Sequence, residues 1–230
     1  MLPEKHIFYE NLANIVIKNF GKRHLSAQYF QSREEAIPNI LDLIPKGDIV
    51  GAGESVTLNQ IEIFRALRER GKNEVIYPFM RNEEGNLTVD WEKANEMMRR
   101  VLLADVFISG TNAITMDGKI VNIDGYGNRV APMIFGPRKV IIVVGVNKIV
   151  KDTNEAINRI KGICAPMNAL RHGIQHHDTE FLELPCAKVG LCVDCHKHQR
   201  MCNFTTVIEG ESHQTSGRLN IVIIGEELGF

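Results

Sequence analysis

Four of the five cysteines lie close together near the C-terminal end of the sequence. Cys186, Cys192, Cys195 and Cys202 follow the pattern C-x5-C-x2-C-x6-C. A C-x-x-C pair lets two thiolates chelate one ion from a single turn, and two flanking cysteines complete a tetrahedral set. The spacing matches neither a standard zinc ribbon nor the C-x2-C-x2-C run of bacterial ferredoxins, so it predicts zinc or a [4Fe–4S] cluster without choosing between them. A redox-active C-x-x-C pair and buried, inert cysteines are the alternatives.

A glycine-rich segment, GAGESVT, occupies positions 51–57 between a predicted strand and a predicted helix. Gly51 and Gly53 allow close approach of a ligand to the backbone, and Ser55 and Thr57 add hydroxyl donors. The segment is neither G-x-G-x-x-G nor a P-loop, and a tight turn with a helix cap is the alternative. Glu54 repels an anion; we therefore consider it either a base that acts on a bound substrate or a first-turn acid that suits the helix dipole.

Polar side chains also follow three other predicted strand ends. They are Asn112, Asp124, Asn128, Arg129, Asn147 and Lys148. Arg129 suits a carboxylate or phosphate through its planar fork, and Lys148 suits it as a point charge. Each asparagine alone is explained equally well by local turn structure. Taken together at one sheet edge, the set predicts an anion-binding site.

The hydrophobic periodicity indicates which elements hold these residues. We expect helices over 4–20, from 32 to 44, and over 57–70, 89–104, 128–135 and 155–163, with strands over 48–50, 74–78, 106–109, 139–145, 205–208 and 219–224 and a hairpin over 113–124. This alternation predicts an α/β fold with a mostly parallel sheet flanked by helices on both faces. We expect a single domain over 1–230, with N-terminal helices over 1–45, an α/β core over 46–180 and an irregular Cys-rich segment with terminal strands over 181–230.

Composition narrows the function classes. The net charge of −1 at pH 7 provides no positive field for nucleic acid, so we expect no nucleic-acid partner. The apolar runs are too short to cross a bilayer and the N-terminus does not read as a signal peptide, so we expect a cytoplasmic protein without a membrane partner. Cysteines in that compartment stay reduced, which favours metal or redox chemistry over disulfides. A homodimer is expected on base rates alone.

The segment Gly51-Ala52-Gly53-Glu54-Ser55-Val56-Thr57-Leu58 resembles the Gly-x-Gly-x-Ser-x-Thr-Leu segment of LUD-domain proteins, the lactate-utilization family that includes LutC and YkgG. Further matching segments are Thr111 to Thr115, Asp124-Gly125, Gly127-Asn128-Arg129, Phe135-Gly136-Pro137 and Gly145 to Lys148. The resemblance implies a fold like the NagB/RpiA/CoA-transferase group, whose members bind sugar phosphates or CoA esters. It also implies a link to the oxidation of lactate to pyruvate with iron–sulfur partner proteins. The segment with the four clustered cysteines, 186–202, resembles the corresponding segment of only some LUD-domain proteins.

Three functions fit these observations. The first is a lactate-utilization component that binds a small carboxylate, sugar-phosphate or CoA-like ligand. The second is an isomerase or an acyl- or CoA-transferase-like enzyme, with Glu54 as the base and with Arg129 and Lys148 holding the anion. The third is a metal-containing ligand-sensing protein. The sequence leaves open whether the protein is an enzyme.

Overall fold

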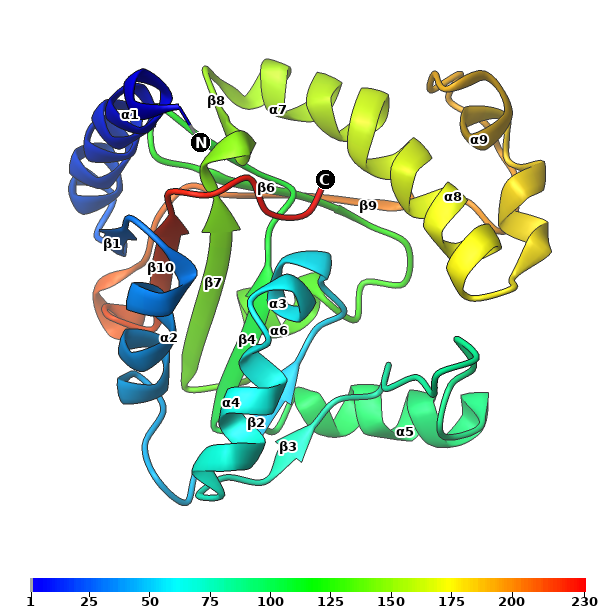
Figure 1. Ribbon diagram of the computed structural model, residues 1–230, viewed down its shortest axis with the longest axis horizontal. Helices are drawn as coiled ribbons and strands as arrows, with labels where there is room; N and C mark the ends of the chain where they lie inside the picture. Colours follow the sequence, from blue (N-terminus) through cyan, green and yellow to red (C-terminus); the bar gives the residue numbers. More distant parts are fainter. Residues whose placement is uncertain (1) are drawn as a thin grey trace.

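A computed structural model describes residues 2–230 and contains two sheets. The larger sheet is entirely parallel and has the strand order β1-β10-β7-β4-β2-β3 (Figure 1). Its strands are β1 (Ser26–Phe30), β2 (Val50–Ala52), β3 (Val75–Ile76), β4 (Val106–Gly110), β7 (Lys139–Gly145) and β10 (Leu219–Ile224). The predicted α/β class with a mostly parallel sheet is confirmed.

Helices cover both faces of this sheet. One face is covered by α1 (Pro3–Lys22), α5 (Trp91–Val101) and α6 (Val130–Ile134), and the other by α2 (Arg33–Asp42), α3 (Val56–Gln60) and α4 (Ile63–Arg70). The remaining helices, α7 (Thr153–Arg159), α8 (Ala165–Gln175) and α9 (Pro185–Val189), pack mainly on other elements. Strand β7 sends Val140, Ile142 and Val144 toward α1, α5 and α6, and sends Ile141 and Val143 toward α2, α3 and α4. A strand buried on both faces must be apolar at every position, which explains the uninterrupted run of β7.

The smaller sheet has the order β8-β5-β6-β9, with strands β5 (Ala113–Thr115), β6 (Ile120–Asp124), β8 (Ile149–Val150) and β9 (Phe204–Ile208). The hairpin of β5 and β6 is as predicted, but its pairing with β8 and β9 was not expected. Strand β8 is two residues long and lies directly after a 3₁₀ turn, η1 (Val146–Lys148), so no periodicity marks it. Helix α7 packs on this sheet through Ala156.

Three local differences from the sequence-based expectations have physical causes. Strand β1 interrupts the N-terminal helical segment, since Ser26–Phe30 pairs in parallel with β10. The helix expected over 57–70 breaks into α3 and α4 at Glu62, whose φ of 55° is left-handed. The helix expected to end near 163 continues as α8, through a π-helical turn, η2 (Ile160–Cys164).

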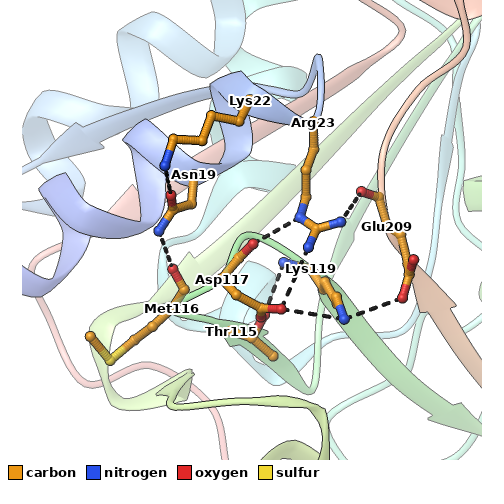
Figure 2. Close-up of polar contacts among 8 residues, drawn as sticks. All are labelled: Asn19, Lys22, Arg23, Thr115, Met116, Asp117, Lys119 and Glu209. Atoms are coloured by element: carbon orange, nitrogen blue, oxygen red, sulfur yellow. Dashed lines mark hydrogen bonds and ion pairs between the residues drawn. The ribbon is translucent and has the colours of Figure 1, made fainter.

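The end of α1 is fastened to the turn between β5 and β6 (Figure 2). Arg23 Nε donates to the carbonyl of Asp117 over 2.8 Å, and Asn19 Nδ2 donates to the carbonyl of Met116 over 2.7 Å. Gly118, at φ +84°, lies so close to α1 that a Cβ there would come within 2.7 Å of the Asn19 carbonyl carbon. The turn thus requires glycine for its conformation and for its contact.

Residues 185–203 hold the four clustered cysteines. Most of this segment is irregular, as expected, but Cys186 lies in the short helix α9 and not in the expected loop. This segment packs beside α8 and a 3₁₀ turn, η3 (Thr179–Glu183), at the right of Figure 1. Within residues 2–230, no helix has both the length and the apolar character to cross a membrane.

Candidate functional site

A pocket of about 560 Å³ opens at the carboxyl ends of the parallel strands. The segment that precedes α5 and the segment of α8 with η3, at the lower and upper right of Figure 1, both contribute to its lining, and they meet where His177 Nε2 lies 2.9 Å from the carbonyl oxygen of Glu84. Seven of the sequence-predicted site residues line it: Glu54, Ser55, Asn112, Asp124, Asn128, Arg129 and Lys148. Ligands of open α/β sheets bind at this edge, and the volume suits a small metabolite.

The two glycines of the glycine-rich segment do not line this pocket. Gly51 lies within β2, where a Cβ would come within 2.8 Å of Val101 Cγ1, and at Gly53 a Cβ would come within 2.8 Å of Ser109 Oγ. Ser55 is the cap of α3, because its hydroxyl accepts from the N–H of Leu58 over 3.3 Å. The glycines therefore let β2 pack closely against its neighbours, and this brings Glu54 and Ser55 to the pocket wall.

Lys148 is almost completely buried at one end of the pocket, with 5% of its surface exposed. Its Nζ donates to Thr57 Oγ1 over 2.9 Å and to the carbonyl of Thr111 over 3.2 Å. Burial lowers the pKa of Lys148 to about 7, and the charges of Arg159 and Arg129 act in the same direction. Thr57 thus lies behind the pocket wall and holds Lys148 in place.

Arg129 is held by neutral acceptors. Its guanidinium donates to Asn122 Oδ1 over 2.6 Å, and to Asn112 Oδ1 and the carbonyl of Ile123 over 3.0 Å each. Asp124 accepts from the backbone N–H of Arg129 over 3.1 Å and so fixes the loop that carries it. Asn112 and Asp124 therefore act as supports for Arg129, whose positive charge remains available to a ligand.

Asn147 does not join the pocket-lining set. Its Oδ1 accepts from the N–H of Leu228 over 3.0 Å and fastens the C-terminal segment across the strand ends. Gly229 in that segment lies against Lys148, since a Cβ at this position would come within 2.7 Å of the Lys148 Nζ. By holding this C-terminal segment in place, Asn147 helps to bury Lys148.

Glu54 lies in a cluster with residues of α8. Arg171 Nη2 is 3.0 Å from Glu54 Oε1, and His172 Nε2 is 3.8 Å from Glu54 Oε2. His176 follows one turn later, with its Nδ1 3.5 Å from Nδ1 of His172. Burial, together with the charges of Arg171 and Arg81, lowers the pKa of His172 to about 3 and that of His176 to about 4. Both imidazoles are neutral at pH 7.

The same cluster has the donor set of a metal site. One ligand atom each from Glu54, His172 and His176 lies within 4.8 Å of the others. Two guanidinium groups, of Arg171 and Arg81, nevertheless repel positive charge there, because they help to prevent protonation of the histidines. A dication meets twice the repulsion that a proton meets. The two positive charges of Arg171 and Arg81 therefore favour an anion over a metal ion in this cluster.

The four clustered cysteines are free and surround one small apolar cavity of about 20 Å³, which adjoins the main pocket and shares with it the lining residues Ala165, Arg200, Met201 and Cys202. Burial raises the pKa of Cys202 to about 11, and the proximity of the thiol groups of Cys192, Cys186 and Cys195 contributes in the same direction. Among the described residues, however, no three of these sulfur atoms lie within 4.8 Å of one another, as the ligand atoms of Glu54, His172 and His176 do. The thiols would have to move closer together to bind one ion.

Comparison with known proteins identifies the family. The model described as the LUD domain matches residues 13–224. The chain belongs to the LUD-domain family. The match spans both sheets and all of the pocket lining except Gly229 and Phe230, and the family is linked to lactate utilization. No curated protein matches the sequence at a significant level.

Solved structures similar to this LUD-domain chain are distant in sequence. A DUF162 family protein from Deinococcus radiodurans is 13% identical, with a TM-score of 0.49, over 96% of this chain and 98% of that one. The eIF2B beta subunit from Chaetomium thermophilum is 15% identical, with a TM-score of 0.36, over 54% and 45%. Ribose 5-phosphate isomerase A from Neisseria gonorrhoeae is 17% identical, with a TM-score of 0.32, over 53% and 54%.

The structure adds pocket residues that sequence reasoning missed. Arg81 comes from the irregular segment before α5, where no motif singles it out. Arg171 and His172 come from α8 and His176 is the residue that caps its C-terminal end; the spacing of four places the two histidines on one helix face. The spacing of the two histidines is a signal in the sequence, but it indicates a shared helix face only once residues 165–175 are known to form a helix.

Proposed function

We propose that this LUD-domain protein is a component of lactate oxidation to pyruvate that binds a small anionic metabolite, a carboxylate or phosphate ester, in the pocket. The observation that carries the proposal is the pair of cations, Lys148 and Arg129, whose side chains donate only to neutral oxygens. Lys148 is also buried, and a buried charge without a counter-charge is unfavourable. An anion at this end of the pocket would supply that counter-charge.

The two cations suit different parts of one ligand. The Arg129 fork binds two oxygens of a planar carboxylate or a phosphate, whereas Lys148 contributes a compact charge and a proton. With its pKa near 7, Lys148 exchanges that proton readily at neutral pH. A ligand that carries a carboxylate beside a hydroxyl or carbonyl, as lactate and pyruvate do, makes use of both groups.

A ligand-stabilisation experiment tests the proposal. Lactate, pyruvate, inorganic phosphate, ribose 5-phosphate and coenzyme A are each added during thermal unfolding of the full chain. A binder at 100 times its Kd should raise the Tm by roughly 5–11 °C for a protein of this size. The Lys148→Met variant should lose this shift. The matched control is Lys139→Met, which removes a partly buried lysine at the opposite end of β7 that donates to the carbonyl of Leu43.

Two results would contradict the proposal. One is the absence of any shift in the wild-type protein with all five compounds at millimolar concentration. The other is an equal shift in the wild-type protein and in Lys148→Met.

The position of Glu54 favours a second candidate, an isomerase or acyl-transfer enzyme in which Glu54 is the base. Its carboxylate lines the pocket, 18% exposed, and belongs to the residue directly before Ser55. Turnover of ribose 5-phosphate or a CoA ester that is lost in Glu54→Gln, with ligand stabilisation kept, would establish this role. Stabilisation without turnover in the wild-type protein would leave the first candidate.

We also propose that Cys186, Cys192, Cys195 and Cys202 hold one metal ion. A cavity of about 20 Å³ supports a single ion such as zinc over a four-iron cluster, because this volume corresponds to roughly one water-sized sphere. Bound zinc would displace the thiol protons that the raised pKa of Cys202 otherwise retains.

Metal analysis and a visible spectrum of anaerobically purified protein test this site. One equivalent of zinc in a colourless sample is expected, with loss of the metal in Cys192→Ser and retention in Cys164→Ser. A brown sample with about four equivalents of iron would show the cluster instead, and a metal-free protein would contradict both readings.

A further inference from the structure

We propose that Arg81 and Arg171 form a second anion subsite in the same pocket, so that the natural ligand carries two anionic groups. This inference rests on the proposed anion binding at Lys148 and Arg129 and extends it to the substrate class. That class is a dicarboxylate or a phosphorylated carboxylic acid. The evidence comes from a different wall of the pocket, formed by α8 and the segment before α5.

Arg81 has unused binding capacity. It lies in the pocket wall, and its Nη1 donates to the carbonyl of Gly85 over 2.9 Å. Its Nε is buried and has no hydrogen-bond partner among the described residues. A buried N–H without an acceptor is destabilising, so a ligand oxygen that reaches it is favoured.

Arg171 pairs with the carboxylate of Glu54, whose charge also acts on Arg81. It is 10% exposed and pairs with Glu54 over 3.0 Å. Glu54 also acts on Arg81 by charge, so one half-buried carboxylate faces two guanidinium groups. Asp178, the other acid near Arg81, is exposed to solvent, which weakens its effect. The buried part of the subsite therefore carries excess positive charge, and this is the condition for binding an anion.

Two neutral histidines beside the subsite are consistent with its excess positive charge. His172 and His176 remain neutral at pH 7, partly because both guanidinium groups repel a proton there. A neutral imidazole still donates one N–H, so the pair adds donors for an anion without adding charge. Glu54 forms an ion pair with Arg171, so the excess positive charge of the subsite resides on Arg81.

The experiment compares ligands with one and two anionic groups by calorimetric titration. Inorganic phosphate and lactate are the probes with one group, and 3-phosphoglycerate and malate are the probes with two. In the wild-type protein, 3-phosphoglycerate should bind about 10- to 100-fold more tightly than phosphate, because a hydrogen bond to a charged group contributes roughly 1.5–3 kcal/mol. Arg81→Gln should reduce that ratio to near one.

The control variant is Arg138→Gln, which removes an exposed arginine outside the pocket and should keep the ratio. If phosphate or lactate binds and depends on Lys148, but the second anionic group adds no affinity, the second subsite is refuted while the proposed function stands. If neither phosphate nor lactate binds the wild-type protein, the proposed function fails and this inference fails with it. An unchanged ratio in Arg81→Gln would refute the role of Arg81 directly.

Discussion

Replacing Lys148 by methionine should change how the stability of the protein depends on pH. The pKa of this lysine is about 7 in the folded protein and 10.5 without the fold. Between these values the unfolded chain holds the proton and the folded protein releases it. Stability of the wild-type protein therefore rises with pH through this window, by up to about 1.4 kcal/mol per pH unit. Lys148→Met lacks this dependence, since methionine does not titrate.

The magnitude makes the effect measurable. From pH 7.5 to pH 9.5 the free energy of unfolding of the wild-type protein should gain about 2–3 kcal/mol relative to Lys148→Met. At pH 6 the variant should be the more stable of the two, because it avoids burying a charge. Urea unfolding at four pH values measures both proteins, and all other titrating groups cancel in the difference. Parallel pH profiles would show that Lys148 is not desolvated and would remove the main support for the anion site.

Two further predictions concern packing and metal selectivity. Gly118→Ala should destabilise the protein by about 2–4 kcal/mol in urea unfolding, whereas Gly217→Ala, with the same φ of +84° and open space around it, should lose only about 1 kcal/mol. Equal losses would show that the contact with α1 at Asn19 is unimportant. Added Co²⁺ should give thiolate charge-transfer bands that disappear in Cys192→Ser and persist unchanged in His172→Ala, since the Glu54 cluster repels dications. Altered cobalt spectra in His172→Ala would contradict that electrostatic reasoning.

The main sheet could be predicted because its signals are local. Positions 140–144 within β7 are all apolar, and Ser32 marks the start of α2 as the cap that accepts from the N–H of Glu35. The spacing of Ser32 and Glu35 also predicts a capping box, in which Glu35 accepts from the N–H of Ser32; in the structure Glu35 accepts from the N–H of Gln31 instead. Patterns of this kind depend on neighbours in the chain, so a single sequence reveals them.

The second sheet could not be predicted because its pairings are distant. Strand β9 pairs with β6 across some eighty residues, from Ile120 against Ile208 to Asp124 against Phe204. Strand β8 is two residues long. Neither feature leaves a periodic pattern, and only the packing of the hairpin against α1 and α7 gives these short strands their stability.

The residues of the pocket also fall into those that the sequence predicts and those that it does not. Arg129 and Lys148 could be found because each follows a strand end. Lys148 follows β7, at the edge where the carboxyl ends of the parallel strands meet, whereas Arg129 follows β6 of the smaller sheet, which pairs antiparallel with β5 and β9. Arg81 and Arg171 could not, because no strand carries them and only the folding of α8 over the sheet brings them to Glu54. Sequence reasoning therefore found the cations on the sheet and missed those on the elements that cover it.

This division changes the interpretation of Glu54. In the sequence Glu54 is a solitary acid beside an expected anion site, and it is explained either as a base that acts on a substrate or as a first-turn acid that suits the helix dipole. In the structure it pairs with Arg171 while Arg81 keeps its charge, so the acid reduces the positive charge of that wall without cancelling it. Replacing Glu54 by glutamine should then strengthen the binding of a ligand with two anionic groups, because it removes repulsion and frees Arg171. Weaker binding in Glu54→Gln would mean instead that the carboxylate contacts the ligand itself, as a base that accepts a hydrogen bond from it must do.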